Sequence, residues 1–158
     1  MYKILLTLCL VAFVATSPII KEINDDLKVD ITVVEDIEEF KNTHPSLELT
    51  PLFSDELQES PFGVIRHTAG SRVAGDRLVA SGSGGQSWAT PQDVQLSLQY
   101  PKSGTGAVLS YVEVLVDQSS NVGEGFIISG GIGQRHIALV IQARSTTHFN
   151  YAAAFYGV

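Results

Sequence analysis

The stretch that decides the fold is residues 110–157, SYVEVLVDQSSNVGEGFIISGGIGQRHIALVIQARSTTHFNYAAAFYG. Strand-like runs alternate there with glycine-rich turns, and apolar residues recur at every second position within several runs. A period of two places alternate side chains on one face of a β-strand. Gly130, Gly131 and Gly133 can adopt positive φ angles at low steric cost, which suits a tight turn. The stretch therefore predicts antiparallel strands joined by short turns.

The same period continues upstream as far as residue 62. Residues 94–100 alternate apolar and polar side chains, whereas residues 108–116 are apolar on both faces and are expected near the sheet centre. The expected strands are 62–67, 76–81, 94–100, 108–116, 126–129, 137–141 and 149–155, while 81–87, SGSGGQS, is expected to be a loop. Residues 61–158 thus predict a mainly β domain, an antiparallel meander that forms a small sandwich or barrel.

Aromatic residues mark the expected core. Phe149, Tyr151 and Phe155 share one face of the last strand, and Phe126 is expected to join the same core wall. Trp88 follows the glycine-rich segment and is expected to cover the core, with an exposed ligand contact as the alternative. Because small barrels can enclose cavities, a small apolar ligand is a further candidate partner.

The N-terminal residues have the pattern of a secretory signal peptide. Lys3 precedes an uncharged apolar run at residues 4–14, and small residues follow it up to the expected cleavage after Thr16. The run is shorter than the about 20 residues that span a membrane. Residues 1–16 are therefore expected to be removed, which places the protein outside the cell and leaves no membrane association. Cys9, the only cysteine, would go with them, so disulfides are not expected.

Charge separates an acidic extension, residues 17–60, from the rest of the chain. The extension carries a net charge of −9 and residues 61–158 carry +1, which predicts a boundary near residue 60. Apolar residues at spacings of three and four predict a helix at 24–41, although the β-branched residues 31–34 argue against it. A linker bracketed by prolines is expected to follow.

Two interpretations of the acidic extension remain open. It packs on the β domain or stays solvated, or it is a removable propeptide or an interaction segment for a partner protein. The chain's net charge of −7 and its scattered basic residues argue against direct binding of nucleic acid.

Catalytic motifs find little support in the sequence. Glycines 82–85 lack the Lys-Ser/Thr of a phosphate-binding loop, and no Gly-x-Ser-x-Gly elbow occurs. Asp76 and Asp93 are candidate paired carboxylates of a hydrolase, but both lie beside turn residues, where aspartate is common. We therefore expect no enzymatic activity and no cofactor.

The four histidines, His44, His67, His136 and His148, are expected to be surface or hydrogen-bonded residues. A metal site needs several ligands that converge on one point, and their spacing does not predict this. A pH-sensitive role for His67 or His136 is a hypothesis that a stability titration can test.

Several short motifs occur in an order that resembles a known family. They are Gly75-Asp76-Arg77-Leu78-Val79, then Asp117-Gln118 after a long strand, Gly130-Gly131-Ile132-Gly133, and the terminal Phe155-Tyr156-Gly157. Across about residues 72–157, this order resembles the arthropod proteins named after multiprotein bridging factor two. The resemblance implies that these positions are structural, and that the domain has no enzymatic activity.

The same resemblance implies a role in protein binding. The family is named for a transcription coactivator that bridges a regulator to general transcription factor IIA, while many members look like secreted, salivary-type proteins. From the leader at residues 1–16 we expect a secreted, non-enzymatic binding protein. The alternatives are a transcription coactivator that bridges proteins, a carrier of a small hydrophobic ligand, and a hydrolase with an unrecognised site.

Overall fold

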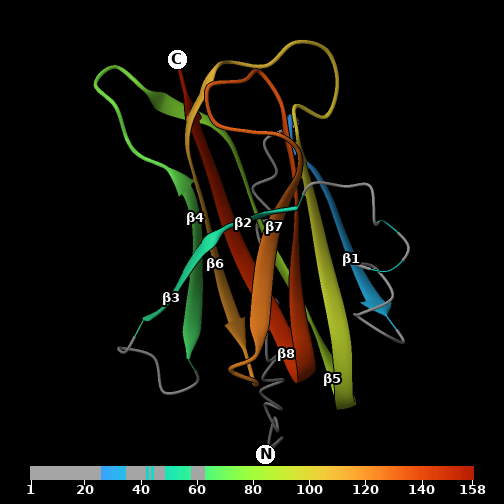
Figure 1. Ribbon diagram of the computed structural model, residues 1–158. Helices are drawn as coiled ribbons and strands as arrows, with labels where there is room; N and C mark the ends of the chain where they lie inside the picture. Colours follow the sequence, from blue (N-terminus) through green and yellow to red (C-terminus); the bar gives the residue numbers. More distant parts are fainter. Residues whose placement is uncertain (1–25, 35–41, 43, 45–48, 58–62) are drawn as a thin grey trace, which may run out of the picture.

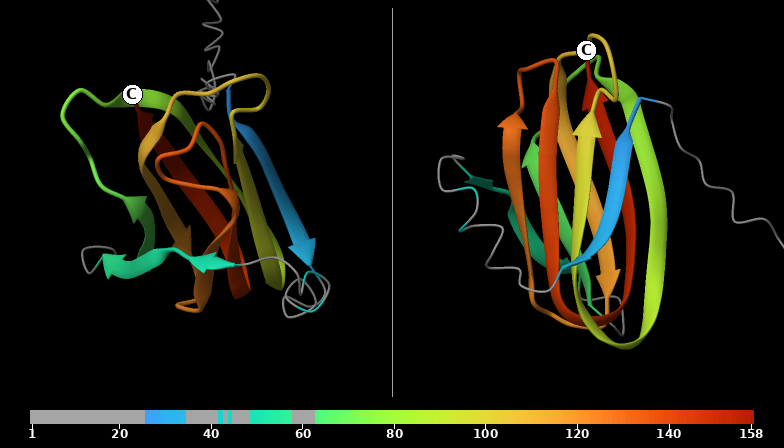
Figure 2. Two further views of the ribbon diagram at one scale, coloured as in Figure 1. Left: turned by 45° about the horizontal axis from the view of Figure 1, so that its top comes forward. Right: turned by 90° about the vertical axis from the view of Figure 1, so that its right-hand side faces the viewer.

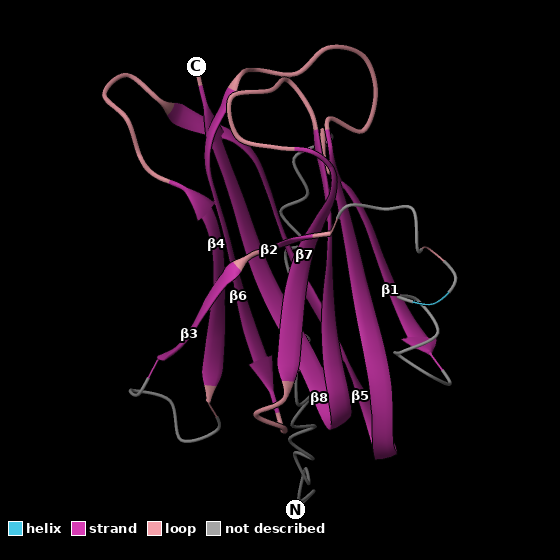
Figure 3. Ribbon diagram, viewed as in Figure 1, coloured by secondary structure: helices cyan, strands magenta, loops and turns pink. Residues whose placement is uncertain are grey.

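The structure is a computed structural model that describes residues 26–34, 42, 44, 49–57 and 63–158. Within these residues the chain forms antiparallel β-strands, which confirms the predicted fold class (Figures 1 and 3). The strands are β1 (Lys28–Val34), β2 (Thr50–Pro51), β3 (Phe53–Leu57), β4 (Val64–Gly70), β5 (Arg77–Tyr100), β6 (Leu109–Gln118), β7 (Gly123–Gly130) and β8 (Ile137–Gly157).

The sheet follows the order β1-β5-β8-β6-β4-β3, and β7 pairs with both β8 and β2. Strands β5 and β8 pair twice, because residues 77–87 of β5 run beside 148–157 of β8 and residues 94–100 run beside 137–143. Between these two ladders both strands bend, and the right panel of Figure 2 shows β5 turning back at one end of the molecule. The bends fold one continuous sheet into two layers.

The core lies between the two layers. One layer contains β1, β7, residues 94–100 of β5 and residues 137–143 of β8. The other layer contains β4, β6, residues 77–87 of β5 and residues 148–157 of β8. Tyr100 from the first layer stacks on Phe155 from the second, with ring centroids 5.9 Å apart. Phe149 and Phe155 are fully buried and each contributes about 1.5–3 kcal/mol to folding.

The expected core is largely confirmed. Phe149, Tyr151 and Phe155 are buried, and the half-buried Trp88 packs against the core as a cover. Phe126 is half-buried but lies outside the main core cluster. Strand β6 is flanked by β8 and β4, as its apolar character on both faces predicted.

The prediction that residues 81–87 form a loop was wrong. They belong to β5, where Gly82 pairs with Ala153 and Gly84 with Tyr151. Glycine and serine have low strand propensity, but the neighbouring strand β8 supplies the hydrogen-bonding partners. The Tyr151 ring occupies the space beside Gly84, which has no side chain of its own. The strands expected separately at 137–141 and 149–155 are parts of one continuous strand, β8, which bends near Ser145, where φ is 51°.

The predicted helix at 24–41 is also wrong in its described part. Residues 28–34 form β1, which pairs antiparallel with β5 from Lys28 opposite Gln99 to Val34 opposite Asp93. The β-branched residues 31–34 favour a strand, and pairing with β5 provides the backbone partners. Residues 24–25 and 35–41 of the predicted helix lie outside the described residues.

The expected linker and the boundary near residue 60 need correction as well. Strand β2 pairs with β7 and β3 pairs with β4, so this part of the extension belongs to the same sheet as residues 63–158. The change in charge near residue 60 therefore does not mark a change of sheet.

The predicted signal peptide, residues 1–16, lies outside the described residues. In the part of the chain that the structure does describe, no helix has the length and apolar character to cross a bilayer.

Candidate functional site

The first group of motif residues forms an ion-pair cluster between β4 and β5. Asp76 accepts hydrogen bonds from the Arg72 guanidinium at 2.7 and 2.9 Å, from the Val73 amide at 2.9 Å and from the Ser110 hydroxyl at 2.8 Å. The carboxylate is 2% exposed although Arg72 is 51% exposed. These four donors make Asp76 the centre of the turn.

The electrostatics of this cluster follow from its contacts. The Arg72 guanidinium holds the pKa of Asp76 well below its ordinary value, with the Val73 amide as the next cause. Arg72 also lies over the ring of Tyr156, with its guanidinium carbon 3.6 Å from the ring centroid. The cluster therefore joins the β4–β5 turn to the last strand.

Neighbouring motif positions lie in the same turn and in the strands beside it. Gly75 occupies the turn with a φ of 86°, and Arg77 is exposed at the start of β5, where it pairs with Gly157. A side chain at Gly157 would contact the Val108 carbonyl group. Tyr156 lies beside Tyr111 with ring centroids 6.0 Å apart.

The glycine motif forms the connection between β7 and β8. Gly130, Gly131 and Gly133 all have positive φ angles, as their sequence predicted. Gly133 donates its amide to the Leu109 carbonyl at 2.7 Å, which links this turn to the start of β6. The motif thus links the β7–β8 connection in one layer to the start of β6 in the other.

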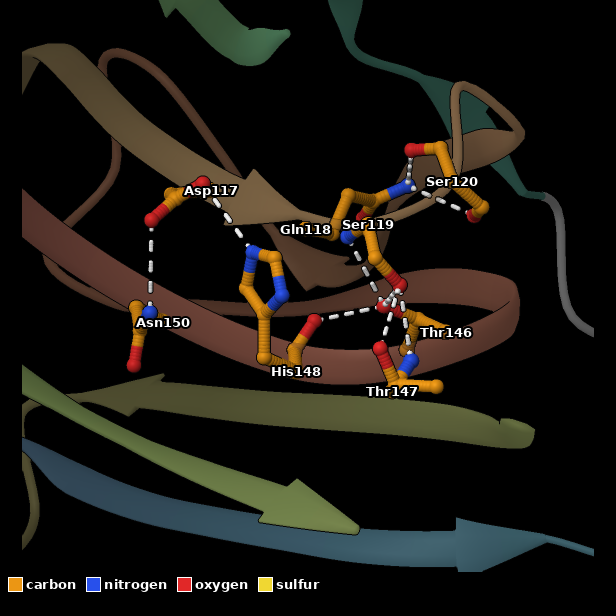
Figure 4. A network of polar contacts seen from close by, with 8 residues as sticks. All are labelled: Asp117, Gln118, Ser119, Ser120, Thr146, Thr147, His148 and Asn150. Atoms are coloured by element: carbon orange, nitrogen blue, oxygen red, sulfur yellow. Dashed lines mark hydrogen bonds and ion pairs between the residues drawn. The ribbon is translucent and has the colours of Figure 1, made fainter. Parts of the chain in front are cut away.

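The Asp117-Gln118 motif lies at the other end of β6, in a polar network with the bend of β8 (Figure 4). Asp117 contacts His148 Nε2 at 3.2 Å and accepts from the Asn150 amide at 3.3 Å. Gln118 is fully buried and donates to the carbonyls of Ser120 at 2.9 Å and Val122 at 3.2 Å. The structure therefore separates the motif residues into clusters at opposite ends of β6.

This network holds the bend of β8 in place. The Ser119 hydroxyl accepts from the Thr147 amide at 2.7 Å and lies 3.0 Å from the Thr146 hydroxyl (Figure 4). These contacts engage Ser119 with backbone and hydroxyl groups of the bend. The network contains serine, histidine and aspartate side chains, in which Ser119 hydrogen-bonds to Thr146 and Thr147 and the His148 ring contacts Asp117.

The two carboxylates considered for a hydrolase are not brought together. Asp76 is held by Arg72, whereas Asp93 accepts from the Ser145 amide at 2.8 Å. Asp93 lies at the bend of β5 and β8, and Asp76 lies near the opposite end of the long strand β5. Each aspartate thus fixes a local backbone conformation.

The histidines occupy separate environments. His44 and His136 are exposed, His148 lies at Asp117, and His67 is buried in β4. Among the described residues, no group of three or more histidine, cysteine, aspartate or glutamate side chains is arranged to hold a metal ion.

His67 was not identified as a core residue by its sequence pattern, and its environment is unusual. It is 1% exposed, and its Nδ1 lies 2.8 Å from the Ser54 hydroxyl. Its Nε2 is buried and has no hydrogen-bond partner among the described residues. Burial lowers the pKa of His67 to about 4, against a small opposing effect of Asp55.

A cleft opens on the flank formed by β1 and the first half of β5. Its volume is about 730 Å³, and its lining combines apolar and polar side chains. The lining residues are Val29, Asp30, Ile31, Ser83, Gly84, Gly85, Gln86, Asn150 and Tyr151. Sequence reasoning missed this site because both of its walls come from segments that were predicted to be helix or loop. We name it the β1/β5 cleft.

A comparison with protein families finds one match over much of this framework. The family model described as transcription activator MBF2 matches residues 69–157, from the end of β4 to the end of β8. Neither the curated proteins nor the solved structures contain a match. The family match covers all the motif positions noted in the sequence.

Proposed function

The chain belongs to the transcription activator MBF2 family, and we propose on this basis that it acts as a transcription coactivator by binding other proteins. The observation that carries the proposal is the match over residues 69–157, which includes the ion-pair cluster, the glycine turn and the C-terminal strand. The chain's net charge of −7 favours protein contacts over contacts with phosphate. The activity we propose is bridging between a DNA-bound regulator and general transcription factor IIA.

A tethering experiment tests this function. The full chain is fused to a heterologous DNA-binding domain and assayed on a reporter in cultured cells, and purified factor IIA is tested for direct binding by biolayer interferometry. We expect activation above the DNA-binding domain alone and saturable binding of factor IIA. No activation and no binding by the folded fusion would refute the proposal.

A second candidate rests on the apolar run at residues 4–14, which favours export and binding outside the cell. The mass of the native N-terminus, measured together with fractionation of cells and medium, separates the two candidates. A chain that begins at Ser17 in the medium supports the secreted binding protein. An uncleaved chain in the nucleus supports the coactivator.

A further inference from the structure

We propose that the β1/β5 cleft binds an extended peptide segment of a partner protein, which adds a strand beside residues 81–87 of β5. The expected segment has apolar residues at alternate positions and at least one basic residue. This inference rests on the proposed function, because it assigns the protein-binding activity to one surface of the domain.

One edge of β5 has no partner among the described strands over residues 81–87. Over residues 81–87, β5 pairs with β8 along one side, while β1 pairs with β5 only over residues 93–99. No other described strand runs along residues 81–87. Backbone groups on that side are therefore available to an added strand.

Residues 81–87 lack the features that normally protect a sheet edge. The other edge strands carry such features: Lys28 and Asp30 in β1, Pro51 in β2, and Asp55 and Glu56 in β3. Residues 81–87 contain only serine, glycine and glutamine. Charged residues and proline block pairing between edges, so this segment is the least protected edge among the described strands.

The orientation of the two walls of the cleft suits a strand added between them. Strand β1 runs antiparallel to the 93–99 part of β5, and β5 reverses direction at its bend (Figure 2). Strand β1 and residues 81–87 therefore run in the same direction on either side of the cleft. A peptide that enters in the opposite direction is antiparallel to both walls, which is the arrangement that the rest of this sheet uses.

The lining of the cleft combines apolar side chains with one carboxylate. Val29, Ile31 and Tyr151 provide apolar contacts for alternate side chains of the peptide. Asp30 is the only charged residue in the lining, and it attracts a basic side chain. Gly84 and Gly85 leave the edge without side chains, so the peptide backbone can approach closely.

A pair of labelled peptides tests the proposal. Each is a blocked ten-residue peptide in which valine alternates with threonine, with lysine near both ends of one peptide and glutamate at those positions in the other. Binding to the full chain is measured by fluorescence anisotropy, and amide hydrogen exchange locates the site. We expect the lysine peptide to bind more tightly, and we expect slower exchange in residues 81–87 of the complex.

Matched variants make the test specific. Ser83→Lys places a charge on the proposed edge, whereas Ser103→Lys places the same charge on an exposed residue outside the cleft. We expect Ser83→Lys to weaken binding at least tenfold and Ser103→Lys to leave it unchanged, with both variants matching the parent in thermal unfolding. If Ser83→Lys does not fold, Ser87→Lys on the same edge replaces it.

In these binding experiments, four outcomes would overturn the proposal: neither peptide binds, Ser83→Lys binds normally, residues 81–87 are already protected in the free chain, or a dimer forms that Ser83→Lys abolishes. The last two would identify another part of this chain or a second copy as the occupant. The reporter separates this inference from the proposed function. If the parent and Ser83→Lys activate the reporter equally, the cleft proposal alone is refuted. If the parent binds the peptide but neither activates the reporter nor binds factor IIA, the coactivator function alone is refuted.

Discussion

Acidification is expected to destabilise this protein through His67. The folded chain holds this imidazole neutral because burial lowers its pKa to about 4, while the ordinary value of 6.5 applies in the unfolded chain. Between these values the unfolded chain binds more protons than the folded chain. The free energy of unfolding therefore falls as the pH decreases from 6.5 towards 4.

The magnitude follows from the two pKa values. Proton linkage gives a loss of about 2 kcal/mol between pH 7 and pH 5, and about 3 kcal/mol by pH 4. His67 is 1% exposed, so solvent screening does not reduce this effect greatly. Asp55 and Asp76 have lowered pKa values, so their contribution to stability is present above 3.8 and is lost only at lower pH. Measurements at pH 5 and above therefore avoid the loss of these two carboxylates.

Urea denaturation followed by Trp88 fluorescence at pH 7, 6 and 5 measures the effect. His67→Gln removes the titrating group and should abolish most of the pH dependence of the free energy of unfolding. His136→Gln changes an exposed histidine and should leave that pH dependence unchanged. Proton NMR of the folded parent gives a direct check, with no titration of His67 above pH 5. A His67 resonance that titrates near 6.5, or equal slopes in the parent and His67→Gln, would refute the reasoning.

Three further predictions concern packing, turn geometry and the ion-pair cluster. Phe155→Ala should reduce the free energy of unfolding by about 3–5 kcal/mol, measured in urea, because the ring is fully buried; a loss below about 1 kcal/mol would contradict the packing. Gly133→Ala should reduce the free energy of unfolding by about 1–2 kcal/mol, because an alanine would have to adopt a φ of 80°. Gly130→Ala should reduce it further, since its new methyl group would clash with the His136 carbonyl. Thermal melts in which Gly133→Ala is the less stable variant would argue against this turn. Asp76→Asn should lower the melting temperature at pH 7 but lose its effect in strong acid, where the parent carboxylate is also protonated; an unchanged melting temperature at pH 7 would exclude a stabilising ion pair.

The core and turns were predictable because their signals are local. Residues 94–100 alternate in polarity, and Phe149, Tyr151 and Phe155 recur at even spacings, so they share a face in any extended conformation. The glycines at 130, 131 and 133 indicated positive φ angles without knowledge of their neighbours, and all three adopt them.

The β1/β5 cleft was not predictable in this way, because its walls depend on distant partners. Residues 81–87 have the composition of a loop and become a strand because β8 provides their backbone partners. Residues 28–34 satisfied a helical spacing, yet pairing with residues 93–99 of β5 decides their conformation.

The sequence by itself determined which segments alternate in polarity and where the chain can turn, since both depend on neighbouring residues alone. Only the tertiary structure decided that Arg72 would hold Asp76 against Ser110, that His67 would be buried, and that residues 81–87 of β5 would have one edge without a partner among the described strands. The physical reason is that hydrogen bonding between strands and the loss of water around a side chain depend on segments far apart in the chain.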